Sequence, residues 1–315
     1  MSTDTDLPII FLMGPTGSGK TDLAVELCKQ LPLDIISVDS AMIYRGMNIG
    51  TAKPDREILA IAPHRLIDIC DPTESYSAAR FCQDASREIA DIHRQGRIPL
   101  LTGGTGLYFR SLQYGLSKLP EADQAVRSRI EADAASHGWD YMHQKLAEVD
   151  PESARRIHPN DPQRIQRALE VYQITGKPLT SHFRDTDVPL LEHRIIKIAV
   201  SPAERQVLHQ RLADRFHIML ERGLVEEVQQ LLKQYALHPG LPSMRLVGYR
   251  QVWQYLLEDL DYINMIKHAI VATRQLARRQ LTWLRKETSV NWLDSEQKQL
   301  VSDVLKILSD NGRIS

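Results

Sequence analysis

Residues 14–21 read Gly-Pro-Thr-Gly-Ser-Gly-Lys-Thr and directly follow the apolar run Ile9–Met13. The stretch fits the pattern G-x-x-x-x-G-K-[ST], which binds phosphates when a strand precedes it and a helix follows. Its glycines let consecutive backbone N–H groups point at one anion, and the lysine adds a positive charge. Helical spacing begins at Lys20, so a helix N-terminus adds partial positive charge. We expect a phosphorylated ligand here, with the Thr21 hydroxyl placed to ligate Mg²⁺.

The loop by itself does not identify its ligand. The pattern is typical of ATP-binding and other nucleotide-binding proteins, but ATPases of this kind also carry an apolar strand that ends in aspartate. The apolar run Ile98–Thr102 ends in Gly103-Gly104-Thr105 instead, which weakens the interpretation as an ATPase. A chance glycine-rich turn is the other alternative, and the flanking strand and helix patterns argue against it.

Strand and helix patterns alternate through the first part of the chain. We expect strands at Ile9–Met13, Asp34–Val38, Arg65–Ile69 and Ile98–Thr102, and helices at Lys20–Leu31, from Ser77 to Gly96 and from Leu107. Such alternation predicts an α/β fold in which helices wrap a parallel sheet, as in P-loop NTPases.

The pattern changes at about Ser117. Residues 121–136, 139–149 and 161–175 all have helical spacing, a strand pattern returns at 194–200, and the chain is then mostly helical up to a strand-like segment at 290–293 and a last helix at 296–308. We therefore predict a first part of the core at residues 1–117, an all-helical insertion domain at 118–192, and a second part of the core at 193–315.

Composition excludes several classes of protein. With 43% hydrophobic and 25% charged residues the chain is expected to be globular, and its apolar runs are too short to cross a membrane. The N-terminus is polar and acidic, unlike an export signal. The odd number of cysteines, at unrelated spacings, suits free thiols in the cytoplasm. No heptad pattern suggests an obligate dimer, so we expect a monomer.

Polar groups follow two of the predicted strands. Asp39 comes directly after Asp34–Val38, where functional groups of open α/β sheets usually lie. It suits a general base, an indirect partner of Mg²⁺ or a cap of the next segment, and its spacing does not decide among these roles. Gly103-Gly104-Thr105-Gly106 allows close backbone approach and offers one hydroxyl, or it is only a tight turn.

The segment from Tyr262 to Lys286 carries six Lys or Arg residues and no Asp or Glu, although the formal charge of the chain is only −1. Four of the six lie along one stripe of a helix: Lys267, Arg274, Arg278 and Arg285. The stripe is either a solvated face or a surface for nucleic-acid phosphates, with Trp283 as a stacking group. A second basic cluster in the predicted insertion consists of Arg155, Arg156, Arg164 and Arg167.

The chain contains, in this order, the motifs GPTGSGKT, DSAMIYRGMNIGTAKP, GGTGLYFR, QRIQR, RFHIMLERGLVEEV, RLVGYR and RRQLTWLRKE. Together they resemble the motifs of the bacterial tRNA dimethylallyltransferases, also called tRNA isopentenyltransferases. The resemblance runs from Gly14 to Lys286, and the motifs that begin with DSAMIYRG and RRQLTWLR are more specific than the phosphate loop.

This resemblance implies transfer of a dimethylallyl group from dimethylallyl diphosphate to N6 of the adenosine 3′ of the anticodon in tRNA, with Mg²⁺. It implies that Asp39 accepts the proton of the amine, that Thr105 lies beside it, and that Lys20 and Arg215 act at the diphosphate. The residues that it implies for diphosphate binding are Gly14, Pro15, Thr16, Gly17, Ser18, Gly19, Lys20 and Thr21. Those that it implies for tRNA binding are Asp39, Ser40, Ala41, Met42, Thr105, Arg127, Gln163, Arg164, Ile165, Gln166, Arg167, Arg245, Gly248, Tyr249, Arg250, Arg278, Arg279, Gln280, Trp283 and Arg285.

Three alternatives use the same phosphate loop. An adenylate isopentenyltransferase or a P-loop kinase acting on a small nucleotide has no need of an acid-free basic helix or of the insertion. An RNA-binding protein switched by a nucleoside triphosphate predicts binding of ATP or GTP and no covalent product.

Overall fold

The computed structural model describes residues 7–117, 119–183, 191 and 193–312 of the chain. The chain divides into two compact units, one formed by Met1–Ser111 with Glu192–Ser315 and the other by Leu112–Leu191. The boundaries of the second unit nearly coincide with those of the predicted insertion at residues 118–192, but the unit begins a few residues earlier than expected.

The first unit is built on a six-stranded parallel sheet with the order β3-β2-β4-β1-β5-β6. Its strands are β1 (Ile9–Met13), β2 (Leu33–Val38), β3 (His64–Arg65), β4 (Ile98–Gly103), β5 (Ile195–Ser201) and β6 (Val290–Asp294). β4 lies between β1 and β2, and Gly103 pairs with both Met13 and Val38. The segments that follow β1, β2 and β4 therefore emerge side by side at one edge of the sheet, where α/β proteins bind ligands.

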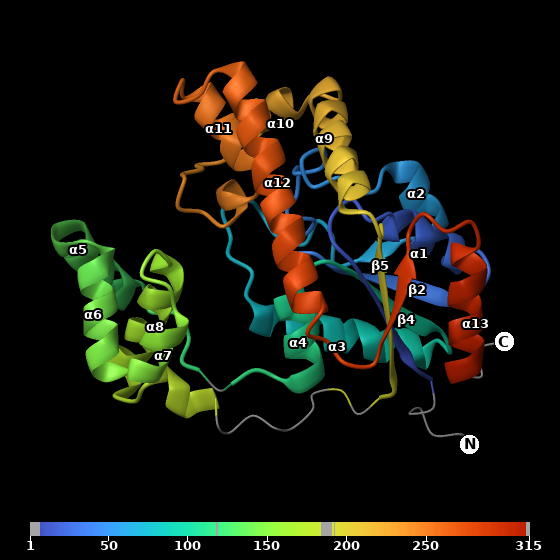
Figure 1. Cartoon of the computed structure of the whole chain (residues 1–315), viewed down its shortest axis with the longest axis horizontal. Helices are drawn as coiled ribbons and strands as arrows, with labels where there is room; N and C mark the ends of the chain where they lie inside the picture. Colours follow the sequence, from blue (N-terminus) through green and yellow to red (C-terminus); the bar gives the residue numbers. More distant parts are fainter. Residues whose placement is uncertain (1–6, 118, 184–190, 192, 313–315) are drawn as a thin grey trace. The chain divides into compact units, whose positions relative to one another are not determined.

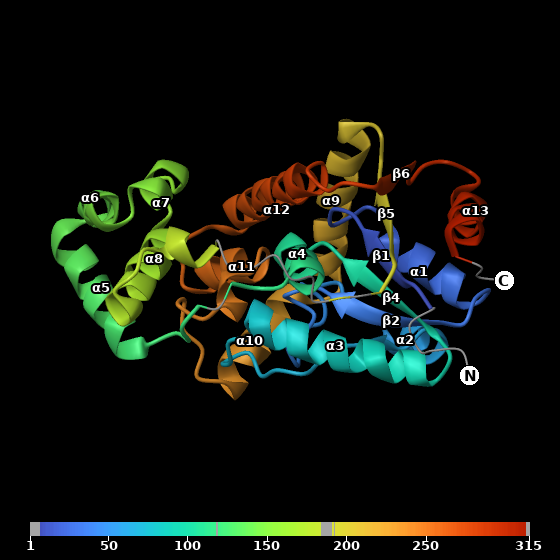
Figure 2. The same cartoon turned by 90° about the horizontal axis from the view of Figure 1, so that it is seen from below.

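Helices cover both faces of this sheet (Figures 1 and 2). The helices before the insertion are α1 (Lys20–Cys28), α2 (Arg56–Ile61), α3 (Ala78–Arg94) and α4 (Gly106–Tyr114). Because side chains alternate along a strand, Ile10 and Leu12 of β1 join the core that α1 and α13 (Leu300–Gly312) cover. Phe11 points the other way and packs its ring on Phe109 of α4, with centroids 5.0 Å apart.

A second core lies among the helices that follow β5. These are α9 (Arg205–Glu221), α10 (Leu224–Gln234), α11 (Tyr249–Leu256) and α12 (Tyr262–Leu284), with a 3-10 turn at Ser243–Arg245. Tyr44 and Met47 of the segment after β2 are buried against Leu224 and Tyr249. The apolar faces of these helices thus hold the segment that begins with Asp39.

The Leu112–Leu191 unit has its own small core. It contains α5 (Gln124–His137), α6 (Trp139–Val149), α7 (Pro151–Arg156), α8 (Pro162–Thr175) and a 3-10 turn at Leu179–Phe183. Its buried centre includes Ile130, Leu146 and Ile165. Asp161 caps α8 by accepting a hydrogen bond from the Arg164 N–H, as its position before Pro162 predicts.

Several sequence predictions were wrong in detail. The strand expected at Arg65–Ile69 is only His64–Arg65, because Leu66 and Asp68 adopt positive φ angles of 61° and 54°, which end an extended segment. The last helix begins at Leu300 instead of Glu296, α1 stops at Cys28, and α2 and α7 were not predicted.

The sequence led to predictions about the cysteines and about membrane-spanning segments, and the described residues bear on both. Cys28, Cys70 and Cys82 are free. Within the part of the chain that the structure describes, no helix has the length and apolar character needed to cross a membrane.

Candidate active site

A cavity of about 440 Å³ opens at the carboxyl ends of the strands, entirely within the first unit. The phosphate loop, the segment after β2 and the segment after β4 supply one part of its wall, and α9 and α12 supply another. The predicted site residues that line it are Thr16, Lys20, Thr21, Asp39, Ser40, Ala41, Met42, Thr105, Arg215, Arg245, Tyr249, Arg279, Gln280 and Trp283. The fold therefore gathers residues that are separated by more than 260 positions.

The phosphate loop has the backbone that its glycines predict. Gly17 and Gly19 have φ angles of +79° and +82°, which favour glycine, and Gly19 directly precedes α1. A side chain at Gly14 would meet the carbonyl oxygen of Val200 at 2.3 Å. The loop is thus packed tightly against β5, and its positive φ angles are those with which glycine-rich loops turn N–H groups toward an anion.

Lys20 is the first residue of α1 and lines the cavity. Its ammonium donates a hydrogen bond to the Pro15 carbonyl oxygen at 3.0 Å. Burial lowers the pKa of Lys20 from 10.5 to about 8; the nearby Asp39 carboxylate opposes this effect, and the Arg215 guanidinium adds to it. Burial also lowers the pKa of Arg215, while Asp39 raises it. Two partly buried cations thus face one carboxylate, an arrangement that a bound diphosphate would stabilise.

Asp39 follows β2 and Thr105 follows β4, and the pairing of these two strands brings both residues to the same place. Asp39 Oδ1 accepts hydrogen bonds from the N–H groups of Ala41 at 2.7 Å and Met42 at 3.4 Å. The Thr105 hydroxyl accepts a hydrogen bond from the Ser40 N–H at 3.2 Å, and the backbone N–H of Thr105 donates to the Val38 carbonyl oxygen. Among the described residues, Asp39 Oδ2 has no hydrogen-bond partner. One oxygen therefore holds the turn and the other is available to a ligand.

Gln280 of α12 joins the two loops of the cavity. Its Oε1 accepts a hydrogen bond from the Thr16 N–H at 2.8 Å, and its Nε2 donates to the Gly104 carbonyl at 3.2 Å. A side chain at Gly104 would meet Gln280 at 2.3 Å, and one at Gly106 would meet the Trp283 ring at 2.3 Å. The glycines after β4 are therefore needed for close packing of α12, which the sequence left open.

Glu227 fixes the segment at residues 48–50, although sequence reasoning gave it no role. Its carboxylate accepts hydrogen bonds from the N–H groups of Asn48, Ile49 and Gly50 and, at 2.5 Å, from the Tyr249 hydroxyl. Burial and this carboxylate raise the pKa of Tyr249, so the hydroxyl stays protonated. No local pattern marks Glu227, because it looks like an ordinary acidic residue in the first turn of α10.

Other predicted residues lie elsewhere. Gly248 lines a small adjoining cavity of about 60 Å³, and Arg250 is exposed on α11. Arg278 and Arg285 line a separate groove on the other side of α12. The structure therefore does not bring these four to the main cavity.

The predicted tRNA-binding residues of the Leu112–Leu191 unit are Arg127, Gln163, Arg164, Ile165, Gln166 and Arg167. Ile165 is buried in the core of that unit. Arg127 and Arg167 both form ion pairs with the fully buried Glu170, at 2.8 and 2.7 Å. Arg164 pairs with Asp161 and Arg156 with Glu152, so much of this basic cluster is already compensated.

The donor set fits Mg²⁺ only together with a phosphorylated ligand. Among the described residues, no group of three His, Cys, Asp or Glu side chains could hold a metal ion. Thr21 lines the cavity next to Lys20 and offers one hydroxyl oxygen. Mg²⁺ commonly takes one or two protein ligands and completes its shell with phosphate oxygens and water. The residues present therefore suit an ion that is bound with a diphosphate.

Sequence comparisons match most of the chain to isopentenyl or dimethylallyl transferases. A family model described as IPP transferase matches residues 42–287, and one described as isopentenyl transferase matches residues 7–66. A tRNA dimethylallyltransferase of Thioalkalivibrio sulfidiphilus is 57% identical over 300 residues, which cover 95% of this chain and 94% of that protein.

Solved structures give the same result. A tRNA isopentenylpyrophosphate transferase of Bacillus halodurans is 34% identical, with a TM-score of 0.71 and coverage of 96% of both chains. One from Staphylococcus epidermidis is 33% identical, with a TM-score of 0.69 and coverage of 97% of this chain and all of that one. A eukaryotic dimethylallyltransferase described as acting on tRNA is 28% identical, with a TM-score of 0.79 and coverage of 96% and 78%.

Proposed function

Because the chain belongs to the tRNA dimethylallyltransferase family, we propose that it transfers a dimethylallyl group from dimethylallyl diphosphate to N6 of the adenosine 3′ of the anticodon in tRNA. One observation carries the residue roles: a single cavity is lined by Thr16, Lys20 and Thr21 of the phosphate loop and by Asp39, a carboxylate with one available oxygen. A phosphate loop serves a leaving diphosphate as well as it serves a nucleoside triphosphate, since both present the same oxygens.

The phosphate loop binds the donor. Its N–H groups, the Lys20 ammonium and the Arg215 guanidinium surround the diphosphate and stabilise the negative charge that grows as the carbon–oxygen bond breaks. Loss of one such donor typically costs about 10²–10³ in rate. Lys20 gives up its hydrogen bond to Pro15 O in exchange for phosphate oxygens.

Asp39 acts on the acceptor. The adenine amine is a weak nucleophile because its lone pair is delocalised into the ring, so bond breaking at the donor must be far advanced when nitrogen attacks. Asp39 Oδ2 accepts a hydrogen bond from the amine and then its proton, which contributes about 10²–10⁴ in rate. Thr105 holds Ser40 in place and presents its hydroxyl to the adenosine.

The reaction balances within these groups. The bond from C1 of the prenyl group to the diphosphate oxygen breaks, and its electron pair leaves with diphosphate. A bond forms from N6 to C1, and one amine proton passes to Asp39. The product is N6-dimethylallyl adenosine in tRNA.

Thr21 would hold Mg²⁺ together with the bound diphosphate, and the ion would supply further charge neutralisation at the leaving group. A stacked base does not reach an enclosed cavity, so the target adenosine is turned out of the anticodon loop. Arg245 and Arg279 at the cavity wall, and exposed Gln163 and Arg164 in the helical unit, are the proposed tRNA contacts. We further propose a cytoplasmic monomer.

The test is transfer of labelled dimethylallyl diphosphate to unmodified tRNA, with AMP and ATP as competing acceptor and ligand. Label in tRNA that is lost when the target adenosine is replaced by guanosine supports the proposal. Label in AMP but not in tRNA would instead indicate an adenylate isopentenyltransferase. ATP hydrolysis or phosphate transfer to a small nucleotide without prenyl transfer would indicate a kinase or an NTP-switched RNA-binding protein.

A further inference from the structure

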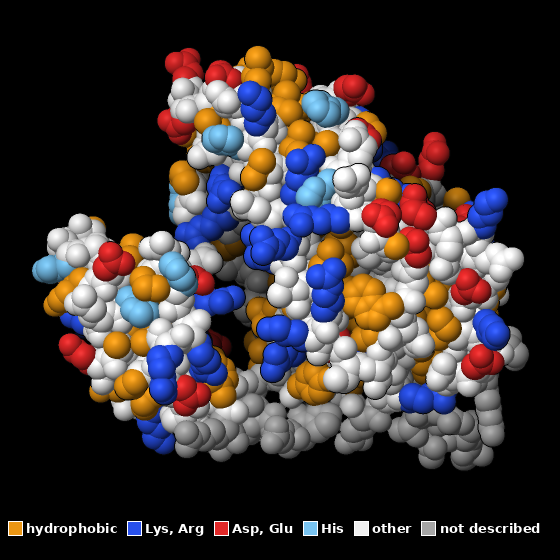
Figure 3. All heavy atoms as spheres, in the orientation of Figure 1, with side chains coloured by type: hydrophobic (Ala, Val, Ile, Leu, Met, Phe, Trp, Pro, Cys, Tyr) orange, Lys and Arg blue, Asp and Glu red, His pale blue; other side chains and the backbone are white. Residues whose placement is uncertain are grey.

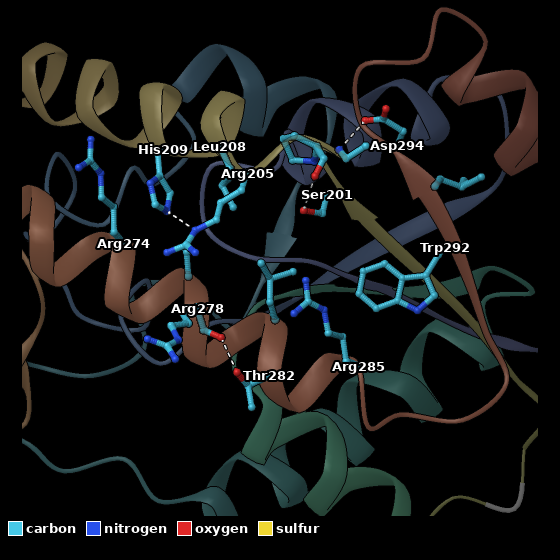
Figure 4. Close-up of a pocket in the computed structure, with 15 residues that line it drawn as sticks. Ser201, Arg205, Leu208, His209, Arg274, Arg278, Thr282, Arg285, Trp292 and Asp294 are labelled. Carbon is cyan, nitrogen blue, oxygen red and sulfur yellow. Dashed lines mark hydrogen bonds between the residues drawn. The ribbon is translucent and has the colours of Figure 1, made fainter.

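A groove of about 690 Å³ lies on the side of α12 that faces away from the active-site cavity (Figure 4). α9, α12, the end of β5 and β6 form its walls, all within the first unit. Arg278 lines the groove and Gln280 the cavity, as expected for positions about 200° apart on a helix. The groove is therefore a second concave surface, separate from the reacting groups.

Positive charge dominates this groove. Arg205, Arg274, Arg278 and Arg285 line it, and none of them forms an ion pair with a carboxylate in the described part of the chain. The acid among the lining residues is Asp294, whose Oδ1 already accepts hydrogen bonds from the N–H groups of Ala203 and Glu296. Figure 3 shows Lys and Arg side chains gathered along α12, with hydrophobic side chains among them.

Two features of Arg274 and His209 record this uncompensated charge. Nε of Arg274 is buried and has no hydrogen-bond partner among the described residues. His209 accepts a hydrogen bond from Arg205 Nε at 3.3 Å, and burial together with Arg205 and Arg274 lowers its pKa. In a fully solvated stripe every guanidinium nitrogen would be open to water, whereas Arg274 Nε is buried.

Much of the remaining lining is apolar. Trp292 of β6 is 43% exposed and turns its ring into the groove beside Arg285 (Figure 4). Buried Leu208 and partly buried Leu281 form the floor. An aromatic ring next to arginines is the arrangement with which proteins bind a base and its phosphates.

We infer that this groove binds a nucleotide, with its base on Trp292 and its phosphates between Arg205 and Arg274. Phosphate groups placed there face guanidinium donors from two helices, because Arg205 belongs to α9 and Arg274 to α12. The inference rests on the proposed function for the source of the nucleotide, which is a tRNA residue outside the active-site cavity. A free nucleotide has the same chemistry, and the experiment separates the two.

The test measures binding and transfer separately. Full-length wild type, Arg205→Ala and Trp292→Leu are compared with Lys267→Ala, which removes an exposed charge from the same helix outside the groove. We expect Arg205→Ala to lower the slope of log K for tRNA against log salt concentration by about 0.7–0.9, and Trp292→Leu to weaken tRNA binding on the order of tenfold. Lys267→Ala should leave both unchanged, and single-turnover transfer at saturating tRNA should stay within about twofold in all variants.

Tryptophan fluorescence gives the second arm. tRNA is expected to quench a component that is absent in Trp292→Leu, and AMP and ATP test the free nucleotide. Quenching by AMP or ATP with unchanged tRNA affinity in both variants would assign the groove to a free nucleotide. Unchanged tRNA affinity with no Trp292-dependent quenching by any of these ligands would overturn the inference. Failure of the proposed function looks different, because wild type would then transfer no label to tRNA.

Discussion

Lys20 is expected to make binding of the prenyl donor sensitive to alkaline pH. Its pKa in the ligand-free protein is about 8, mainly because of burial, so the ammonium that meets the diphosphate is lost in the range where free lysine stays charged. A bound diphosphate stabilises the ammonium and raises this pKa again. Donor binding therefore takes up a proton above about pH 8.

The structure sets the size of the effect. Between about pH 8 and about pH 9.5 the protonated fraction of Lys20 falls from about one half to about 3%, so kcat/KM for dimethylallyl diphosphate should fall by roughly 15-fold. kcat, which reports the bound state, should stay flat to higher pH. The free energy of unfolding changes in the opposite direction to kcat/KM. In the unfolded chain Lys20 keeps its proton up to about pH 10.5, whereas in the folded protein it loses the proton from about pH 8. Raising the pH from 8 to 10.5 therefore stabilises the folded protein, by at most roughly 3 kcal/mol.

The assay is a pH profile of kcat/KM for wild type and for Lys20→Arg, with unfolding by denaturant over the same range for wild type and Lys20→Met. Arginine stays charged throughout, so Lys20→Arg should lose the alkaline decline even if its rate is lower. Wild type should gain stability relative to Lys20→Met as pH rises from 8 to 10.5. A decline of equal size in Lys20→Arg, or a flat wild-type profile, would refute the role given to Lys20.

Three further substitutions test other parts of the site. Asp39→Asn keeps the oxygen that holds the turn and should lower single-turnover transfer by about 10²–10⁴, with tRNA affinity nearly unchanged; a similar loss of tRNA affinity would make Asp39 a binding residue. Gln280→Leu removes the acceptor of the Thr16 N–H and should raise KM for the donor about three- to tenfold. An unchanged KM would show that Gln280 does not position the phosphate loop. Glu227→Gln should lower the free energy of unfolding by about 1.5–3 kcal/mol, whereas exposed Glu226→Gln should not; equal denaturation midpoints would contradict the role of Glu227 in fixing residues 48–50.

The parts of the site that depend on local sequence could be predicted. The phosphate loop follows from glycine positions between a strand and a helix, and Gly17 and Gly19 have the positive φ angles that this geometry requires. Asp39 and Thr105 follow strands, and each was singled out for that reason. That they become neighbours depends on the strand order, in which β4 lies between β1 and β2, and no local pattern states that order.

Local sequence patterns could not predict contacts between residues that are far apart in the chain. Gln280 and Thr16 are 264 positions apart, and Glu227 and Gly50 are 177 apart, so these hydrogen bonds exist only once the helices after β5 have packed on the sheet. The resemblance to the family implies tRNA binding by Arg127 and Arg167, and it gave no sign that both pair with Glu170. A glutamate one turn along a helix looks solvent-exposed in a sequence, and its complete burial is a property of the packed unit.

Because α12 forms a wall of both concave surfaces, its side chains offer poor starting points for redesigning substrate preference. Arg278 and Arg285 project from the helix that holds Gln280 against the donor loop, so any substitution there that shifts α12 changes recognition and turnover together. Arg205 and Trp292 reach the groove from α9 and β6 instead. An engineer who wants to retune RNA selection while leaving the chemical step intact should randomise those two positions first.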